Sequence, residues 1–401
     1  MTKDQQLMDE LGEDRIWGGS FKLVCGVYFV MLIAFVLLRM TAGFGVVRHL
    51  PNGVLDVGFT IIVQIVIMTI IPYVATKYYF AKKQKSAPDS LNEGQVRAIK
   101  QMSTAMGFKK MSFKMFAIAV GLGFAMYLFN LFVASFFTGL LNIIGFRFSS
   151  GGALPWTGVS GLFIAMVMIA VLPGFCEEVT HRGFLQKSLN ARLGVVPALF
   201  WTSLLFGLMH MNIVQFFYAT ILGFFIGLAV MATRNLWVGV ILHFMNNGVG
   251  TYLSFANENG WWGVNFHTNL MDFVLATGGM FFIAAAVWGI YILMIRCIHI
   301  WARDTYKTRR TEHVVSMIPH DPALMESAGK IGAHLDIFID EVEQQVARAT
   351  RHKQLMFYID AATILPKRKP VNLDRTEKIL LYTATVLGSV VTVFTLVWGL
   401  L

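Results

Sequence analysis

Residues 157–182 read TGVSGLFIAMVMIAVLPGFCEEVTHR, an apolar stretch that runs directly into two adjacent carboxylates, Glu177 and Glu178. An α-helix needs about 20 apolar residues to cross the hydrocarbon core of a bilayer, and the apolar part at 157–175 has that length. An ionisable side chain in such a place costs on the order of a few kcal/mol and marks a candidate functional site. The stretch therefore predicts a transmembrane helix that carries functional carboxylates.

The whole chain has the composition of a polytopic membrane protein. Of its 401 residues, 56% are hydrophobic and 14% are charged, whereas ordinary soluble domains are about 25% charged. The apolar segments are also longer than the strands of a membrane β-barrel, which have about ten residues. We predict an all-α bundle of eight core transmembrane helices and one C-terminal transmembrane helix. The spans are placed near 22–38, 54–76, 115–138, 157–175, 195–211, 214–232, 236–254, 272–296 and 379–401.

The distribution of Lys and Arg predicts how this bundle is oriented. The segment from Lys77 to Lys114 holds nine Lys or Arg residues, and such an excess in a short loop marks the cytoplasmic side. Counting spans from there places residues 1–21 and 297–378 inside and the loop 255–271, with Glu258 as its one charged residue, outside. We predict a multi-pass protein of a bacterial plasma membrane with a cytoplasmic N-terminus.

Four segments follow from these spans: a cytoplasmic segment at 1–21, a transmembrane domain at 22–296, a cytoplasmic insert at 297–378 and a C-terminal transmembrane helix at 379–401. The insert contains a helix start at Asp321-Pro322 and apolar residues at helical spacing, which predicts an amphipathic helix. Those apolar residues are Ile331, Leu335, Phe338, Val342 and Val346. We expect this helix to pack on its own membrane domain or on a second copy, as in a homodimer.

Charge also limits the partners of the chain. The net charge is +10, but the basic residues lie in juxtamembrane loops, so nucleic acid is not an expected partner. The run Lys367-Arg368-Lys369 precedes the last span and is expected to attract anionic lipid headgroups.

Three short polar clusters interrupt consecutive apolar blocks. The first runs from Glu177 to Arg182, and in it Glu178 and Arg182 are four residues apart and share one face of a helix. Glu177 lies about 100° away from Glu178 around the helix, so one arginine does not easily satisfy both. The second cluster runs from Phe206 to His210 and the third from His243 to Asn247.

The three clusters together, EExxxR, FxxxH and HxxxN in this order, resemble the CAAX protease and bacteriocin-processing (CPBP) family, which includes the type II CAAX prenyl endopeptidases. The resemblance covers roughly residues 100–255. It implies an intramembrane endopeptidase that cleaves a membrane-embedded or lipid-anchored peptide or protein. In this family's scheme Glu177 and His210 hold and deprotonate a water, and His243 and Asn247 stabilise the oxyanion. Glu178 is then held by Arg182, and Phe206 supports the site.

Three alternatives stay open. A divalent metal such as zinc is one, because Glu177, His210 and His243 are ligand types that zinc proteases use, although the HExxH motif is absent. A rhomboid-like serine protease is the second, since Gly158 to Gly161 matches GxSG and Ser160 would pair with His243. The third is a non-catalytic scaffold or regulator of a partner membrane protein.

The predicted spans contain one geometric difficulty. If the fifth span begins near Val195 at the cytoplasmic face, His210 lies about 22 Å deep, whereas Glu177 lies near the inner surface to which water has cytoplasmic access. Either the fourth helix continues past Pro173-Gly174, or the fifth helix begins later, near Pro197, and leans strongly. Both solutions are compatible with a broken or tilted helix that lines a wet cavity.

Overall fold

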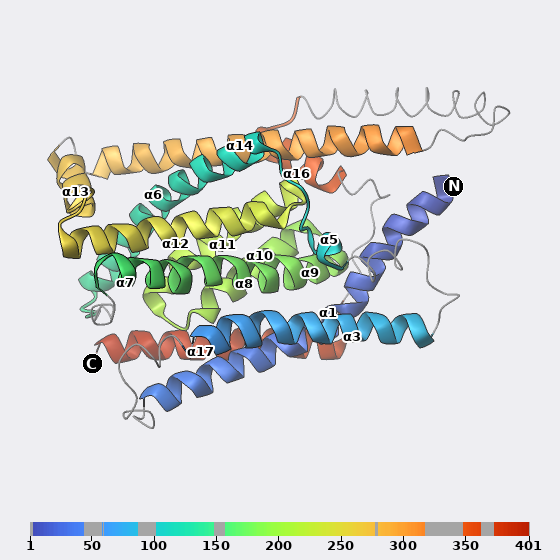
Figure 1. The fold of residues 1–401 in the computed structure, drawn as a ribbon, viewed down its shortest axis with the longest axis horizontal. Coiled ribbons are helices and arrows are strands. Elements are labelled where there is room, and N and C mark those ends of the chain that lie inside the picture. Colours follow the sequence, from blue (N-terminus) through green and yellow to red (C-terminus); the bar gives the residue numbers. More distant parts are fainter. Residues whose placement is uncertain are drawn as a thin grey trace.

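The computed structural model describes residues 3–43, 58, 60–86, 102–147, 157–276, 280–316, 348–361 and 373–400. Most of the long helices run roughly parallel or antiparallel to one another (Figure 1), and the described residues contain no strand. Seven helices among them are long and apolar enough to cross a membrane. The prediction of an all-α polytopic bundle is confirmed.

Most of the predicted spans correspond to one helix or to one unbroken series of helices. The first three contain α1 (Lys3–Gly43), η1 (Ile62–Ile70) with α3 (Ile71–Ser86), and α6 (Phe113–Ile143), with the short α5 (Met102–Met106) before α6. The fourth contains α7 (Gly158–Ala165), η3 (Met166–Val171), α8 (Leu172–Glu178), η4 (Val179–Leu185) and α9 (Gln186–Leu193). The others contain α10 (Val195–Met209), α11 (Ile213–Thr233), α12 (Leu236–Asn259), α13 (Phe266–Ala276) with α14 (Met280–Ser316), and α17 (Arg375–Leu400); α16 (Arg351–Ala361) lies in the insert.

Two predicted spans do not have the features of a simple crossing helix. α10 has 15 residues and is counted only among the shorter apolar helices. α12 is long enough, but polar side chains such as His243 and Asn246 lower its hydropathy, and it is not one of the seven spans. Both helices instead pack against α11 in the interior of the bundle.

The fourth span does not end at residue 175, as the apolar pattern indicated, but continues as helix to Leu193. Gly194, at φ 85°, then reverses the chain into α10. Glu177 lies 16 residues before Leu193 and His210 lies 15 residues after Val195, so both lie about 22 to 24 Å from this turn at 1.5 Å per residue. Continuation of the fourth helix past Pro173 is therefore what brings the two clusters to one depth.

Capping residues in the sequence explain where several helices begin. The Asn212 side chain accepts hydrogen bonds from the N–H groups of Val214 and Gln215 at the start of α11. The Asn235 side chain accepts one from Trp237 at the start of α12. Each satisfies donors that the first helical turn leaves unpaired. Both chain reversals next to the second and third clusters are thus encoded locally.

α17 is attached to the bundle at both of its ends. At its start Asp374 and Glu377 form a reciprocal capping box, with two N–H to carboxylate hydrogen bonds of 2.8 Å. Glu377 also receives a 2.6 Å hydrogen bond from Arg192 at the end of α9. Near its other end, Thr395 accepts a hydrogen bond from the Ile213 N–H. α17 therefore packs as part of the membrane bundle, beside α1 and α10.

The predicted boundary between the transmembrane domain and the insert falls inside a helix. α14 runs without a break from Met280 to Ser316, and its candidate span ends at Lys307. The predicted amphipathic helix and the run Lys367-Arg368-Lys369 lie outside the described residues. α16 of the insert packs against α14, where His299 and Gln354 share a hydrogen bond of 3.1 Å.

Candidate active site

A cavity of about 600 Å³ lies between α8, the end of α10, α11 and α12. Four of the predicted catalytic residues line it: Glu177, His210, His243 and Asn247. They come from three helices, and the chain reversals described above bring them together. The three sequence clusters therefore form one site.

Glu177 is the carboxylate that faces this cavity. Its side chain is 8% exposed, and Oε1 accepts a 2.9 Å hydrogen bond from Gln64 in η1. Its Oε2 lies 4.0 Å from Nε2 of His243 and has no hydrogen-bond partner among the described residues. A buried carboxylate oxygen requires a hydrogen-bond donor, and here a water in the cavity can supply it.

Glu178 points the other way and holds a buried charge network. Its Oε1 accepts two hydrogen bonds, one of 2.8 Å from Arg182 Nη1 and one of 2.9 Å from His243 Nδ1. The Glu178 and Arg182 side chains are completely buried. Arg182 donates further to the Gly223 carbonyl at 2.9 Å. The predicted Glu178–Arg182 pair exists, and it has the additional effect of orienting the His243 ring.

Close helix packing makes room for this network. A Cβ atom on Gly239 of α12 would lie 2.9 Å from Glu178 Oε2 and 2.7 Å from a methyl group of Val230. A Cβ on Gly223 of α11 would lie 3.0 Å from the Phe206 ring. Small residues at such positions let membrane helices approach closely. The two glycines allow α11 and α12 to close around the buried carboxylate.

His210 follows the last residue of α10, and its Nδ1 lies 2.8 Å from the Phe206 carbonyl oxygen. A carbonyl only accepts, so Nδ1 carries the hydrogen and Nε2 holds the lone pair of the neutral ring. Phe206 is itself buried and packs edge-on against the rings of His210 and His243, at centroid distances of 5.2 and 5.7 Å. The Arg182 guanidinium lies over the same ring at 4.5 Å. Phe206 thus lies between His210, His243 and Arg182.

Asn247 belongs to a chain of three amides. Asn130 donates to Asn246, and Asn246 donates to Asn247, at 3.1 and 2.9 Å. Asn247 in turn donates to the Ile169 carbonyl at 2.9 Å. Pro173 has no N–H group, so the usual helical donor to that carbonyl is missing. One amide hydrogen of Asn247 therefore compensates for the proline, and the other is available to the cavity.

Sequence reasoning missed several residues of this site. Gln64 is an amide inside the apolar run IIVQIVIMTII, which is a usable signal, but no pattern indicates which helix it faces. The fully buried His181, not assigned a role from the sequence, lies 2.8 Å from the Glu177 carbonyl oxygen and 3.2 Å from the Tyr28 hydroxyl. Tyr28 also donates to the Leu205 carbonyl. These contacts fix the backbone around Glu177 from α1.

The serine alternative does not form a site. Ser160 is exposed in the first turns of α7 and does not line the cavity. It precedes Glu177 by 17 residues, which is about 25 Å along a helix. His243 binds Glu178 and faces Glu177, so it does not pair with Ser160.

The donor arrangement gives no support for a metal centre. Within the described ranges, no group of three or more His, Cys, Asp or Glu side chains could hold a metal ion. His243 uses Nδ1 for Glu178, so only Nε2, which lies 4.0 Å from Glu177 Oε2, could face an ion.

The cavity extends along α12 in one direction. From His243 its lining passes Gly250 and Ser254 to Glu258, in the last turn of that helix. Glu258 lies at the opposite end of α12 from Arg234 and the basic loops. We predicted that those loops are cytoplasmic and that water reaches the site from the cytoplasm. The two predictions are incompatible, because the cavity extends toward the other end of α12. If the basic loops are inside, the cavity opens to the outer face.

Comparison with known proteins places this site in a recognised sequence segment. Residues 159–249 match the family model described as type II CAAX prenyl endopeptidase Rce1-like. The segment begins in α7, ends in α12 and includes every residue of the three clusters. No curated protein and no solved structure matches the chain.

Proposed function

We propose, from the membership of this chain in the CAAX protease family through its Rce1-like segment at residues 159–249, that it is a glutamate-dependent intramembrane endopeptidase. The family predicted from the three motifs is confirmed, and with it a multi-pass membrane protein of the protease class. The observation that supports the mechanism is that Glu177 lines the cavity next to His243 while its Oε2 has no hydrogen-bond partner among the described residues. The substrate is a membrane-embedded or lipid-anchored peptide or protein.

Hydrolysis starts from a water bound at Glu177 Oε2 and His210 Nε2. Glu177 takes a proton from this water as general base, and the hydroxide oxygen attacks the carbonyl carbon of the peptide. The C–N bond of the tetrahedral intermediate then breaks, and the leaving amine takes the proton back from Glu177. The scheme needs the two side chains on opposite sides of the water, as their separate helices allow. No step runs through zinc or another divalent ion.

The oxyanion of the intermediate is stabilised from α12. Glu178 accepts from His243 Nδ1, which orients the ring so that Nε2 lies on the side of Glu177, and a hydrogen on Nε2 would be donated to the oxyanion. Asn247 contributes its second amide hydrogen. Donors aimed at such a charge are worth about 3 to 4 kcal/mol each in other enzymes. The pair Glu178–Arg182 acts through His243 and is a positioning element.

Comparative proteomics of membrane fractions tests the proposal in cells. We expect at least one membrane protein or lipid-anchored peptide to accumulate uncut when the chromosomal copy carries Glu177→Ala, and to be cut with the wild-type chain. If every membrane peptide is equally processed in both strains while deletion of the whole chain has a phenotype, the scaffold alternative replaces the enzyme.

Removing the partner of Glu177 is expected to slow the reaction without stopping it. Gln64→Leu deletes the 2.9 Å hydrogen bond to Glu177 Oε1 and lets the carboxylate rotate away from the water. We expect kcat to fall about ten-fold with little change in KM, since one hydrogen bond to a charged group is worth about 1.5 to 3 kcal/mol. Gln64→Glu should be worse, because it places a second carboxylate beside Glu177. Equal kcat values for Gln64→Leu and wild type would exclude a positioning role.

The side from which substrate arrives can be measured by cysteine labelling. Ser254→Cys places a thiol in the cavity near its end at Glu258. A membrane-impermeant thiol reagent added outside intact cells is expected to label it and to inhibit cleavage. Lys83→Cys, at the end of α3 among the basic residues, should react only after the cells are opened. The reverse pattern would show that the basic loops face outward, and the cavity would then open inward.

A further inference from the structure

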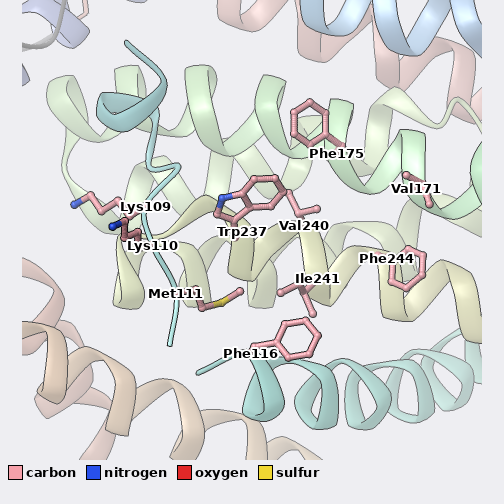
Figure 2. Close-up of a pocket in the computed structure, with 10 residues that line it drawn as sticks. All are labelled: Lys109, Lys110, Met111, Phe116, Val171, Phe175, Trp237, Val240, Ile241 and Phe244. Carbon is pink, nitrogen blue, oxygen red and sulfur yellow. The ribbon is translucent and has the colours of Figure 1, made fainter. Parts of the chain in front are cut away.

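A second hollow lies on the opposite side of the contact between α8 and α12. It is an apolar groove of about 580 Å³ between the start of α6, η3 with α8, and α12. Figure 2 shows Lys109 and Lys110 at one end and Phe244 at the other, with Trp237 between them. Trp237 and Phe244 are seven residues apart on α12, or about 10 Å. The groove is therefore elongated, cationic at one end and apolar along its length.

The groove is separate from the catalytic cavity. A Cβ on Gly174 would lie 3.2 Å from the Phe244 backbone nitrogen, so α8 and α12 touch through their backbones at this point. Glu177 and His243 line the cavity, whereas Phe175 and Phe244, on the same two helices, line the groove. No residue lines both. A molecule in the groove does not reach the reacting atoms.

The cationic end is held in place by the main chain. The Leu236 N–H donates to the Gly107 carbonyl at 2.8 Å, and the Asn235 side-chain amide lies 3.3 and 3.4 Å from the carbonyl oxygens of Lys109 and Lys110. These contacts fasten the segment between α5 and α6 across the start of α12. Both lysine side chains are exposed. The backbone that carries both lysines is thus held at the end of the groove.

An aromatic cluster forms the wall next to the lysines. Phe108 stacks on Phe175 at a centroid distance of 5.6 Å and meets Trp237 edge-on at 5.0 Å. Trp237 is 40% exposed, and its indole nitrogen points toward the lysine end in Figure 2. Tryptophan and lysine together are typical of the headgroup level of a bilayer. The lysine end therefore lies at the membrane surface and the Phe244 end in the hydrocarbon.

We infer that this groove binds an anionic phospholipid, with its phosphate at Lys109 and Lys110 and one acyl chain along Trp237, Ile241 and Phe244. The charge selects the headgroup, because a zwitterionic lipid offers no net attraction to two ammonium groups. The apolar walls select a hydrocarbon chain. The lysines lie at the depth of the lipid headgroup and the apolar walls at the depth of its acyl chains, so one lipid molecule can contact both. The inference concerns binding only and does not depend on whether the chain is a protease.

Fluorescence quenching by brominated acyl chains tests the inference. The full-length protein is reconstituted in phosphatidylcholine vesicles that contain a minor fraction of brominated phosphatidylglycerol or, in parallel, of brominated phosphatidylcholine. The chain has nine tryptophans, so the signal of Trp237 is the difference between wild type and Trp237→Phe. Each lysine beside an anionic lipid contributes about a five-fold gain in affinity, so the pair predicts about a 25-fold preference for phosphatidylglycerol. We expect unlabelled phosphatidylglycerol to relieve the quenching.

Two variants separate the headgroup from the chain. Lys109→Gln/Lys110→Gln should abolish the preference, whereas Lys82→Gln/Lys83→Gln, an equal charge loss at the end of α3, should keep it. Ile241→Phe fills the groove and should abolish quenching of Trp237 although both lysines remain. Equal quenching by the two brominated lipids, loss of the preference in the α3 variant, or quenching that survives Ile241→Phe would each overturn the inference. Relief by a farnesylated peptide but not by unlabelled phosphatidylglycerol would assign the groove to a substrate lipid instead.

Discussion

Glu177→Gln is expected to lower the rate of peptide cleavage by about a thousand-fold, the middle of the range that a positioned general base contributes. The amide has the size of the carboxylate and can still bind Gln64, which donates to Oε1 at 2.9 Å. It cannot take the proton of the water. The measurement is the single-turnover rate of the purified, reconstituted protein on a substrate found by proteomics, with binding measured separately.

A matched control is available in the same cavity. Glu258 also lines it, but in the last turn of α12, and Glu258→Gln removes an equal charge far from the proposed water. We expect this variant to retain a rate within a few-fold of wild type. If both glutamine variants cleave normally, Glu177 is not the base. If both variants are inactive, the effect of Glu177→Gln reflects the total charge of the cavity and not the position of Glu177.

The candidate residues could be selected from the sequence because they depend on residue types and not on helix ends. Glu177, His210 and His243 are ionisable residues within apolar blocks, which is unusual enough to be seen in one sequence. Their meeting point was harder to predict, because it depends on how far the fourth helix extends. The apolar pattern ended the fourth span at residue 175, but Arg182 and Gln186 are buried and bonded to α11, and the helix continues to Leu193.

Contacts between distant helices could not be predicted from the sequence. Gln64 and Tyr28 reach the Glu177 region from helices far away in the chain, and helical spacing carries no information about which neighbour a face meets. The same limit applies to the direction of the cavity. Lys and Arg counts concern loops, whereas the cavity follows the polar face of α12 from His243 to Glu258. Orientation and access are therefore separate questions, and cysteine labelling addresses both.

The buried ion pair between Glu178 and Arg182 is also a matter of stability. Arg182→Met removes the guanidinium from a carboxylate that has no exposure and leaves it, among the described side chains, only His243 as a partner. Breaking one side of a buried pair costs about 3 to 5 kcal/mol. We expect a loss of this size in the free energy of unfolding, measured with a thiol-reactive dye that reports exposure of the buried Cys25 and Cys176.

The double variant Glu178→Gln/Arg182→Met distinguishes a charge effect from a packing effect. It removes both charges, so the unpaired buried carboxylate no longer exists and the protein should be more stable than Arg182→Met alone. Arg303→Met, which breaks an exposed pair with Asp304 at 3.5 Å, is the control and should cost less than about 1 kcal/mol. A double variant as unstable as the sum of its single variants would mean that Glu178 and Arg182 act independently. Since Glu178 also binds His243, the stabilised double variant should still cleave slowly, because the ring loses its charged partner.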